Sequence, residues 1–400
     1  MSAPGAFRRH ATRLTARLAA AIGVAVALHA SPAVAAHAQV PPPPVDTTNP
    51  DSIAAREARR VRRAAEAPLF ATDSVLRFTL VADLKALGGQ RDTLKPRTFK
   101  GVLHVAGDGG RTASVPVRLT TRGHYRLRTC AFPPLRLAFD SGTGGTPFAR
   151  QSVLKLGTHC RSGNSRHEEY VAREYLAYRA HGLVMGPHAF RTRLARVRYV
   201  SARDPATADT TQAEEHWGLL IEHDRMLAAR LGGRLLEQRN AKFEDVAPDS
   251  GVGLALFEYF LGNSDWSLAA LHNVRLVTRP DGDVYAVGYD FDFSGLVDTD
   301  YAVPDPRLPI RSVRQRIWRG PCATPGALAA ALAPYTERRA ALEALWREPV
   351  PGTPAGASWL DDGYARGAQK WVAEFFDTVR DPADFLRRTR RDTDGCKISN

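Results

Sequence analysis

The sequence is poor in cysteine and lysine, and both shortages narrow the possible functions. The four cysteines include no Cys-x-x-Cys pair, so a cysteine-based zinc site is not expected. Lysine supplies only 7 of the 55 basic residues. The net charge of +13 therefore comes mainly from arginines spread along the chain, which suit anionic partners without specifying one. There is no zinc finger, aromatic-basic RNA-binding motif or basic heptad array, so no nucleic-acid partner is expected.

Long apolar runs are also absent after the first 40 residues. No later stretch reaches the roughly 18 apolar residues of a membrane span, so the mature chain should have no membrane anchor. The N-terminus itself resembles a secretion signal. It has a basic start with four arginines, an apolar segment at 18–30 and a small-x-small site at 36–38. We interpret residues 1–38 as a signal peptide and expect an exported, periplasmic or extracellular protein.

Export changes the meaning of the cysteines, because an oxidising compartment favours disulfides over free thiols. An even number of cysteines is typical of such proteins. Local pairing predicts the disulfides Cys130–Cys160 and Cys322–Cys396, which is one of three possible connectivities.

The order of the predicted elements indicates an α+β protein with two lobes. Residues 39–70 are proline-rich and charged and are interpreted as a linker. Residues 71–222 contain alternating segments typical of strands, with one helix expected from 165 to about 180. Residues 223–400 are mostly helical in pattern, except for a hairpin at 273–289. We therefore expect an antiparallel-sheet N-terminal lobe and a mostly helical C-terminal lobe that carries this hairpin.

A possible metal site surrounds the hairpin. Asp265 lies in the loop before it, Asn273 opens its first strand, and Asp290 and Asp292 follow its second strand. Since the outer ends of a hairpin lie side by side, Asn273 and Asp290 should be neighbours close to Asp265. Carboxylate and amide oxygens suit Mg²⁺ and the phosphates that it accompanies. The alternative is that these residues only bond turn backbone, a common role of Asp and Asn.

Phosphate binding also favours a nearby cation. Lys155 is the one lysine in a convincing strand ahead of a helix, and Arg122 could add an anion contact. Glu174, on the following helix, is the expected partner of Lys155, with Glu168 and Glu169 as alternatives. The latter two are equally explained as first-turn acids that favour the helix dipole.

These motifs together resemble the CotH-like (spore coat protein H) family of atypical kinases. The resemblance covers approximately residues 75–300. It consists of the segments RG at 122–123, FPPLRL at 132–137, LKL at 154–156, WGLLIE at 217–222, GNSD at 262–265, HN at 272–273 and YDFD at 289–292. The usual G-x-G-x-x-G loop is missing, and Asp265 and Asn273 are farther apart than in ordinary protein kinases.

The resemblance implies a two-lobed protein-kinase-like fold and Mg-ATP-dependent phosphorylation of protein Ser/Thr hydroxyls. Lys155 would then meet the phosphates, Glu222 would lie at the hinge beside the adenine, and Asp290 would bind Mg²⁺. Asp265 would act as base or metal ligand. The partners would be ATP and a protein substrate, while the oligomeric state is not specified. Two alternatives remain open: a catalytically inactive binding or assembly module of the cell envelope, and an arginine-rich surface for anionic polysaccharide or nucleic acid.

Overall fold

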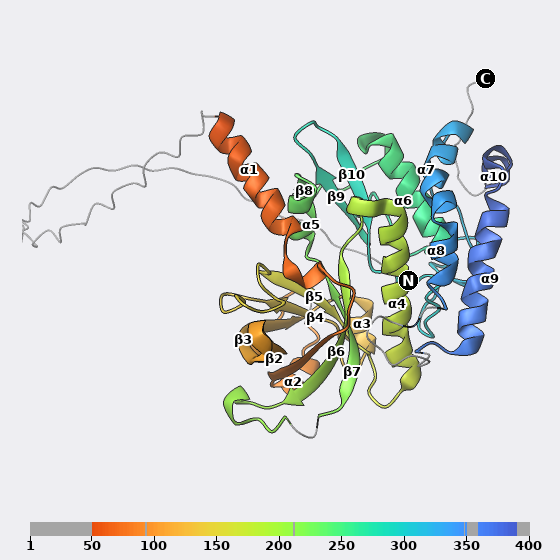
Figure 1. Cartoon of the computed structure of the whole chain (residues 1–400). Helices are drawn as coiled ribbons and strands as arrows, with labels where there is room; N and C mark the ends of the chain where they lie inside the picture. Colours follow the sequence, from red (N-terminus) through yellow and green to blue (C-terminus); the bar gives the residue numbers. More distant parts are fainter. Residues whose placement is uncertain (1–49, 93, 211–212, 348, 350–358, 390–400) are drawn as a thin grey trace, which may run out of the picture. The chain divides into compact units, whose positions relative to one another are not determined.

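Alternating apolar residues in the first half of the chain form a β-barrel in the computed structural model (Figure 1). The structure describes residues 50–389 except 93, 211–212, 348 and 350–358, so the predicted signal peptide lies outside the described residues. Leu76, Phe78 and Leu80 alternate along the first strand and point into the barrel core, as the pattern predicts. The barrel strands are β1 (Leu76–Ala82), β2 (Phe99–Ala106), β3 (Thr112–Thr121), β4 (Leu135–Ala138), β5 (Val153–Gly157), β6 (Thr192–Ser201) and β7 (Glu215–Ile221).

The expected two-lobed protein-kinase-like fold with an antiparallel-sheet N-terminal lobe is wrong. The seven strands close in the order β1-β2-β3-β4-β5-β7-β6, and β1 pairs parallel with β6 while the other neighbours are antiparallel. The parallel pair runs from Leu76 opposite Ala195 to Ala82 opposite Ser201, and it joins the two strands that would otherwise be sheet edges. Closure removes the exposed edges of the sheet.

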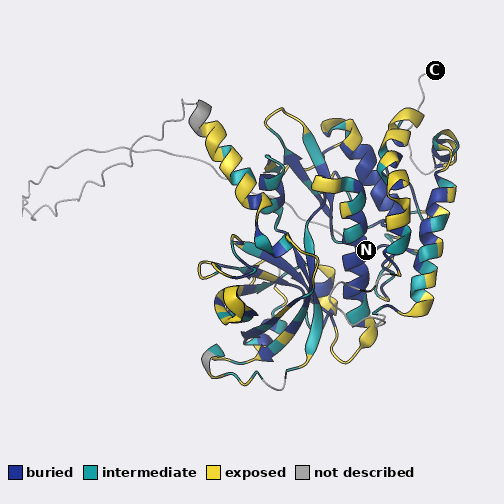
Figure 2. Ribbon diagram, in the orientation of Figure 1, coloured by how far each residue is buried: buried dark blue, intermediate teal, exposed yellow. Residues whose placement is uncertain are grey.

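A long helix, α4 (Ser165–Met185), separates the barrel strands β6 and β7 from the helices of the second half (Figure 1). It begins at an Asn164 cap and continues past the expected end near residue 180 to Met185, where Gly186 caps it at φ +54°. Most of its residues are buried, because it contacts strands on one side and α6 (Pro248–Leu261) and α7 (Pro325–Glu337) on the other (Figure 2).

The second half contains the predicted hairpin within a three-stranded sheet. Strand β9 (Val274–Thr278) pairs with β10 (Val284–Gly288) on one side and with the short β8 (Arg234–Leu236) on the other. The buried helix α6 contacts β10 and ends at Gly262, whose φ of +67° starts the loop that carries Asp265. The other helices are α5 (Asp224–Arg230), α8 (Arg339–Ala344), α9 (Asp362–Thr378) and α10 (Pro382–Thr389). None of the helices in the described part of the chain is long and apolar enough to cross a membrane.

Part of the expected linker is helical instead. Residues Pro50–Ala65 form α1, which contacts α5, and Arg60 donates a hydrogen bond to the carbonyl of Gly233 at 2.9 Å. Two short helices lie between consecutive barrel strands: α2 (Leu84–Gly88) between β1 and β2, and α3 (Tyr125–Thr129) between β3 and β4. The described residues belong to one unit, and the expected lobe boundary at 222/223 falls inside it, between β7 and α5.

The predicted Cys130–Cys160 disulfide is confirmed, with the two Cα atoms 4.6 Å apart. It ties the end of α3 to the segment between β5 and α4. The other expected pair, Cys322–Cys396, includes a residue outside the described part of the chain.

Candidate functional site

A cavity of about 590 Å³ collects the predicted metal and phosphate residues. It is bordered by α3 and the turn before it, by β5, by the loop after α6 and by the ends of the β9–β10 hairpin. Its acidic and amide lining residues are Asp265, Asn273, Asp290 and Asp292. Its basic lining residues are Arg122, Arg126, Arg128, Lys155, Arg239 and Arg275, with His124 and His272 beside them. Such a mixture suits an anionic ligand accompanied by a cation.

The hairpin brings Asn273 and Asp290 together, as the sequence predicts. Val274 lies opposite Gly288 in the antiparallel register, and the Tyr289 N–H donates to the carbonyl of Asn273 at 3.0 Å. Both residues have left-handed backbone, with φ of +53° at Asn273 and +65° at Asp290. Asn and Asp tolerate this conformation better than other non-glycine residues, which explains their presence at these bends.

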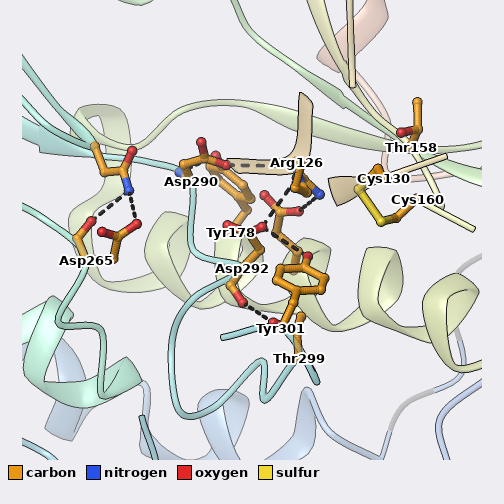
Figure 3. A network of polar contacts seen from close by, with 12 residues as sticks. Arg126, Cys130, Thr158, Cys160, Tyr178, Asp265, Asp290, Asp292, Thr299 and Tyr301 are labelled. Carbon is orange, nitrogen blue, oxygen red and sulfur yellow. Dashed lines mark hydrogen bonds and ion pairs between the residues drawn. A yellow bond between two sulfur atoms is a disulfide. The ribbon is translucent and has the colours of Figure 1, made fainter. Parts of the chain in front are cut away.

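Asp265 completes the group from the loop after α6 (Figure 3). The side-chain amide of Asn273 donates to the Asp265 carbonyl at 2.7 Å and to its Oδ2 at 3.1 Å. His272 Nε2 lies 3.0 Å from Asp265 Oδ1, and this hydrogen bond raises the pKa of His272. Because the amide nitrogen of Asn273 faces Asp265, its amide oxygen takes no part in these two contacts.

Arg126 stands at the centre of the acidic groups (Figure 3). Its guanidinium lies 3.3 Å from Asp292, 3.4 Å from Glu174 and 3.8 Å from Asp290. Burial would raise the pKa of Asp290, but the positive charges of Arg122 and Arg126 hold it below its usual range. Asp290 is therefore ionised, and a quarter of its side chain remains exposed at the cavity.

Asp292 and Glu174 are more deeply buried than Asp290, and their pKa values shift upward instead of downward. Burial raises the pKa of both carboxyls, although Arg126 opposes the shift. Asp292 Oδ2 accepts a hydrogen bond from the hydroxyl of Tyr301 at 3.0 Å, whereas Glu174 Oε1 is buried without a hydrogen-bond partner. In this arrangement Asp292 is already occupied by Arg126 and Tyr301, so it is a poorer cation ligand than Asp290.

Lys155 lines the cavity but is not paired with Glu174, so the expected ion pair is wrong. Its ammonium group bonds Asp224, and Glu168 and Glu169 bond His216 and Arg173 instead. The physical reason lies in the register of the barrel. Lys155 is opposite Ile221 on β7, so the start of α5 three residues later faces the lysine, while Glu174 faces α3.

The surroundings of Lys155 make its ammonium group easier to deprotonate. Burial lowers the pKa of Lys155 to about 8, with Asp224 opposing the shift and Arg122 adding to it. Asp224 also accepts a hydrogen bond from Arg275 Nε at 2.7 Å. Lys155 and Arg275 therefore share the carboxylate of Asp224.

Arg122 and Glu222 were both expected to contact ATP, but only Arg122 lies at the cavity. Arg122 lines the cavity, where its positive charge acts on Asp290. Glu222 does not line it: its carboxylate is fully buried and bonds Arg230 at 3.0 Å and the Arg191 N–H at 3.2 Å. The carboxylate of Glu222 is thus committed to structure.

Sequence reasoning missed Asp224, Arg275 and the hydroxyls of Tyr178 and Tyr301. The Asp290 N–H donates to the hydroxyl of Tyr178 on α4 at 2.9 Å, which fixes the backbone at the hairpin end (Figure 3). Asp224 carries a signal that could have been used, because it is the first helical residue after a strand. The tyrosines carry none, since only tertiary structure brings them to the hairpin.

Comparison with known proteins adds no family assignment. No protein-family model matches the sequence, and no curated protein matches it either. The functional interpretation therefore depends on the cavity and its side chains.

Proposed function

We propose that the protein is an exported phosphotransferase that moves the γ-phosphoryl group of Mg-ATP to Ser or Thr hydroxyls of a protein substrate. The observation that carries this proposal is the joining of Asp265, Asn273 and Asp290 in one cavity with Lys155 and several arginines. Oxygen ligands for a hard cation and positive groups for phosphates are the two requirements of phosphoryl transfer. The Cys130–Cys160 disulfide is compatible with export.

The residues present fit Mg²⁺. Asp290 is ionised and partly exposed at the cavity, and the amide oxygen of Asn273 is left over from its contacts with Asp265. Asp290 and Asn273, with Asp265 close by, would hold the ion. Mg²⁺ bound there would neutralise phosphate charge.

The protein's own residues then bind and orient the reactants. Arg122 and Lys155 attract the phosphate oxygens. The carboxylate of Asp265, held by His272 and Asn273, receives the proton of the acceptor hydroxyl. The acceptor oxygen forms its bond to the γ-phosphorus as the bond to the β–γ bridging oxygen breaks, and ADP leaves with that oxygen.

One observation favours a second function, a binding or assembly module of the cell envelope without turnover. Asp292 is occupied by Arg126 and Tyr301, and Lys155 is neutralised by Asp224. In such a module the same cavity would bind an anion and release it unchanged.

Asp290→Asn tests the nucleotide site. Asparagine keeps the left-handed backbone and removes only the charge, so the ligand-free variant should stay folded and lose only the stabilisation that the Asp290 charge gains from Arg122 and Arg126. Mg-ATP at about 100 times its Kd should stabilise the native protein by roughly 2.7 kcal/mol. The variant should lose this stabilisation, as measured by thermal unfolding with and without Mg-ATP.

Asp281→Asn is the matched control, because Asp281 lies in the exposed turn at the opposite end of the same hairpin. It should retain the full nucleotide effect. Transfer of radiolabel from ATP to a generic protein acceptor then separates the two functions: labelling supports the enzyme, and nucleotide binding without labelling supports the module. An unchanged Mg-ATP effect in Asp290→Asn contradicts both.

A further inference from the structure

Two histidines and a glutamate form a second polar cluster that does not line the cavity. They are His159 after β5, Glu168 in the first turn of α4, and His216 on β7. One side-chain nitrogen or oxygen from each residue lies within 4.8 Å of the others. Three segments that are distant in sequence thus place three potential metal ligands together.

Glu168 connects the cluster. Its Oε1 lies 2.6 Å from His216 Nδ1 and 4.0 Å from His159 Nδ1, and its Oε2 accepts the N–H of Trp217 at 2.7 Å. The backbone contact fixes the carboxylate between the two imidazoles. The imidazole rings are nearly parallel, with centroids 3.9 Å apart.

One atom of the cluster and one of a neighbouring tyrosine have no hydrogen-bond partner among the described residues. His159 is 2% exposed, and its Nδ1 is buried and unpartnered. The hydroxyl of Tyr199, whose ring centroid is 5.8 Å from that of His159, is buried and unpartnered as well. Such atoms are rare in native proteins and call for an explanation such as an ion.

The other nitrogen of His159 indicates which atom would bind the ion. Its Nε2 lies 3.0 Å from the hydroxyl of Ser162. When Nε2 donates a proton to Ser162, the lone pair of Nδ1 is free toward Glu168. An outer hydrogen bond of this kind is typical of metal-binding histidines.

We propose that His159, Glu168 and His216 bind one Zn²⁺ ion, with a fourth position open to water. Two imidazole nitrogens and one carboxylate oxygen are a recurrent zinc ligand set, whereas hard ions such as Mg²⁺ prefer oxygen alone. Zinc bonds of about 2.0–2.1 Å at tetrahedral angles place ligand atoms roughly 3.3 Å apart. That value lies between the 2.6 Å and 4.0 Å separations from Glu168 Oε1. Binding also requires the two stacked imidazoles to turn until a nitrogen of each points at the ion.

Two consequences follow from this geometry. The ion takes the place of the hydrogen bond between Glu168 and His216. It also fastens the first turn of α4 to β7 and to the segment after β5, which the Cys160 disulfide already holds. The site therefore secures the connection between barrel and helix and is separate from the proposed nucleotide chemistry.

Isothermal titration of the chelator-treated protein with Zn²⁺ tests the proposal. We expect binding of one ion per chain. His216→Gln, at a partly exposed position, should weaken binding at least tenfold, and His159→Gln should do the same. Co²⁺ should give the absorption bands of a tetrahedral site in the native protein and lose them in both variants.

His104→Gln is the control, because His104 is a histidine of β2 that contacts Ser114, outside the cluster. It should bind Zn²⁺ like the native protein, and so should Asp290→Asn, which separates this test from that of the nucleotide site. Circular dichroism of each variant verifies folding. Absence of Zn²⁺ binding to the native protein, or binding that is unchanged in folded His216→Gln and His159→Gln, overturns the proposal.

Discussion

Arg126 shows how one side chain can determine the charge state of a site. It is 8% exposed and lies within 4 Å of three carboxylates, from α4 and from the segment after β10. The buried guanidinium and the buried carboxylates stabilise one another, because each charge would carry an uncompensated desolvation penalty if it were buried alone. The arginine thus fixes the arrangement of the acids before any ligand binds.

Arg126→Met should lower the free energy of unfolding by about 3–5 kcal/mol, because it leaves Glu174 and Asp292 buried without their cation. Urea unfolding at pH 8 measures the loss. At pH 5 the loss should be smaller, since both carboxyls have raised pKa values and can then become neutral.

The control is Arg118→Met, which breaks an exposed ion pair with Asp140 at 2.5 Å. Its loss should be about 0–1 kcal/mol, the ordinary value of a surface pair. Similar losses in both variants would contradict the central role of Arg126.

At the same scale, sequence reasoning succeeded where contacts are local. Asn273 and Asp290 are neighbours because a hairpin requires it, and this was predictable from two strands and a turn. The partner of Lys155 was not, because it depends on the register of β5 against β7 and on the direction of α4. The same applies to the histidine cluster, whose members have no recognisable metal-ligand spacing in the sequence.

At the scale of elements, α3 shows how a very short helix can position a site. Its five residues include Arg126, and its C-terminal cap is Cys130, which is bonded to Cys160 beyond β5. A five-residue helix has little stability of its own, since the first hydrogen-bonded turn is costly to form. The disulfide therefore holds the arginine at the cavity (Figure 3).

Replacing both Cys130 and Cys160 with Ala should lower the free energy of unfolding by about 3–4 kcal/mol. The sequence separation is 30 residues, and opening a loop of that size gives the unfolded chain this much additional conformational entropy. Guanidinium unfolding without reductant measures the change. The m-value should rise slightly as the unfolded chain expands, and a loss below about 1 kcal/mol would contradict the role assigned to the bond.

The elements that sequence reasoning missed share physical causes. Alternation revealed the barrel strands but not their closure, because the parallel pairing of β1 with β6 joins residues more than a hundred positions apart. Helix α1 is polar and arginine-rich, so its composition concealed a helix that contacts α5. Strand β8 has only three residues and gives no periodic signal.

For the whole molecule, buried ionisable groups link stability to pH. Burial raises the pKa of Glu258 on α6 to about 8, and burial also raises that of Glu174. Buried histidines shift in the opposite direction: burial lowers the pKa of His159 to about 4 and that of His181 to about 3. Between about pH 4.5 and 6.5 the acids and the histidines therefore oppose each other. Above pH 6.5 the acids dominate, until Lys155, with its pKa lowered to about 8, begins to oppose them.

We expect the free energy of unfolding to fall as pH rises from about 6.5 to 8. In this window folded Glu258 and Glu174 keep protons that the unfolded chain has already released. The folded state then binds more protons than the unfolded state, so a rise in pH favours unfolding. Each group contributes up to about 1.4 kcal/mol per pH unit. Urea unfolding at a series of pH values measures the slope.

Glu258→Gln tests how much of the pH dependence of the free energy of unfolding comes from Glu258. Glu258 Oε2 accepts a hydrogen bond from Asn263 at 2.8 Å, and the amide oxygen of glutamine can accept it equally well. The variant resembles the protonated acid at every pH, so its stability should match that of the native protein below about pH 4.5 and exceed it by a growing margin as pH rises to 8. Because only the contribution of Glu174 remains, the slope should be roughly halved. An unchanged slope would mean that Glu258 is already ionised in the folded protein, and that burial beside Asn263 does not keep it neutral.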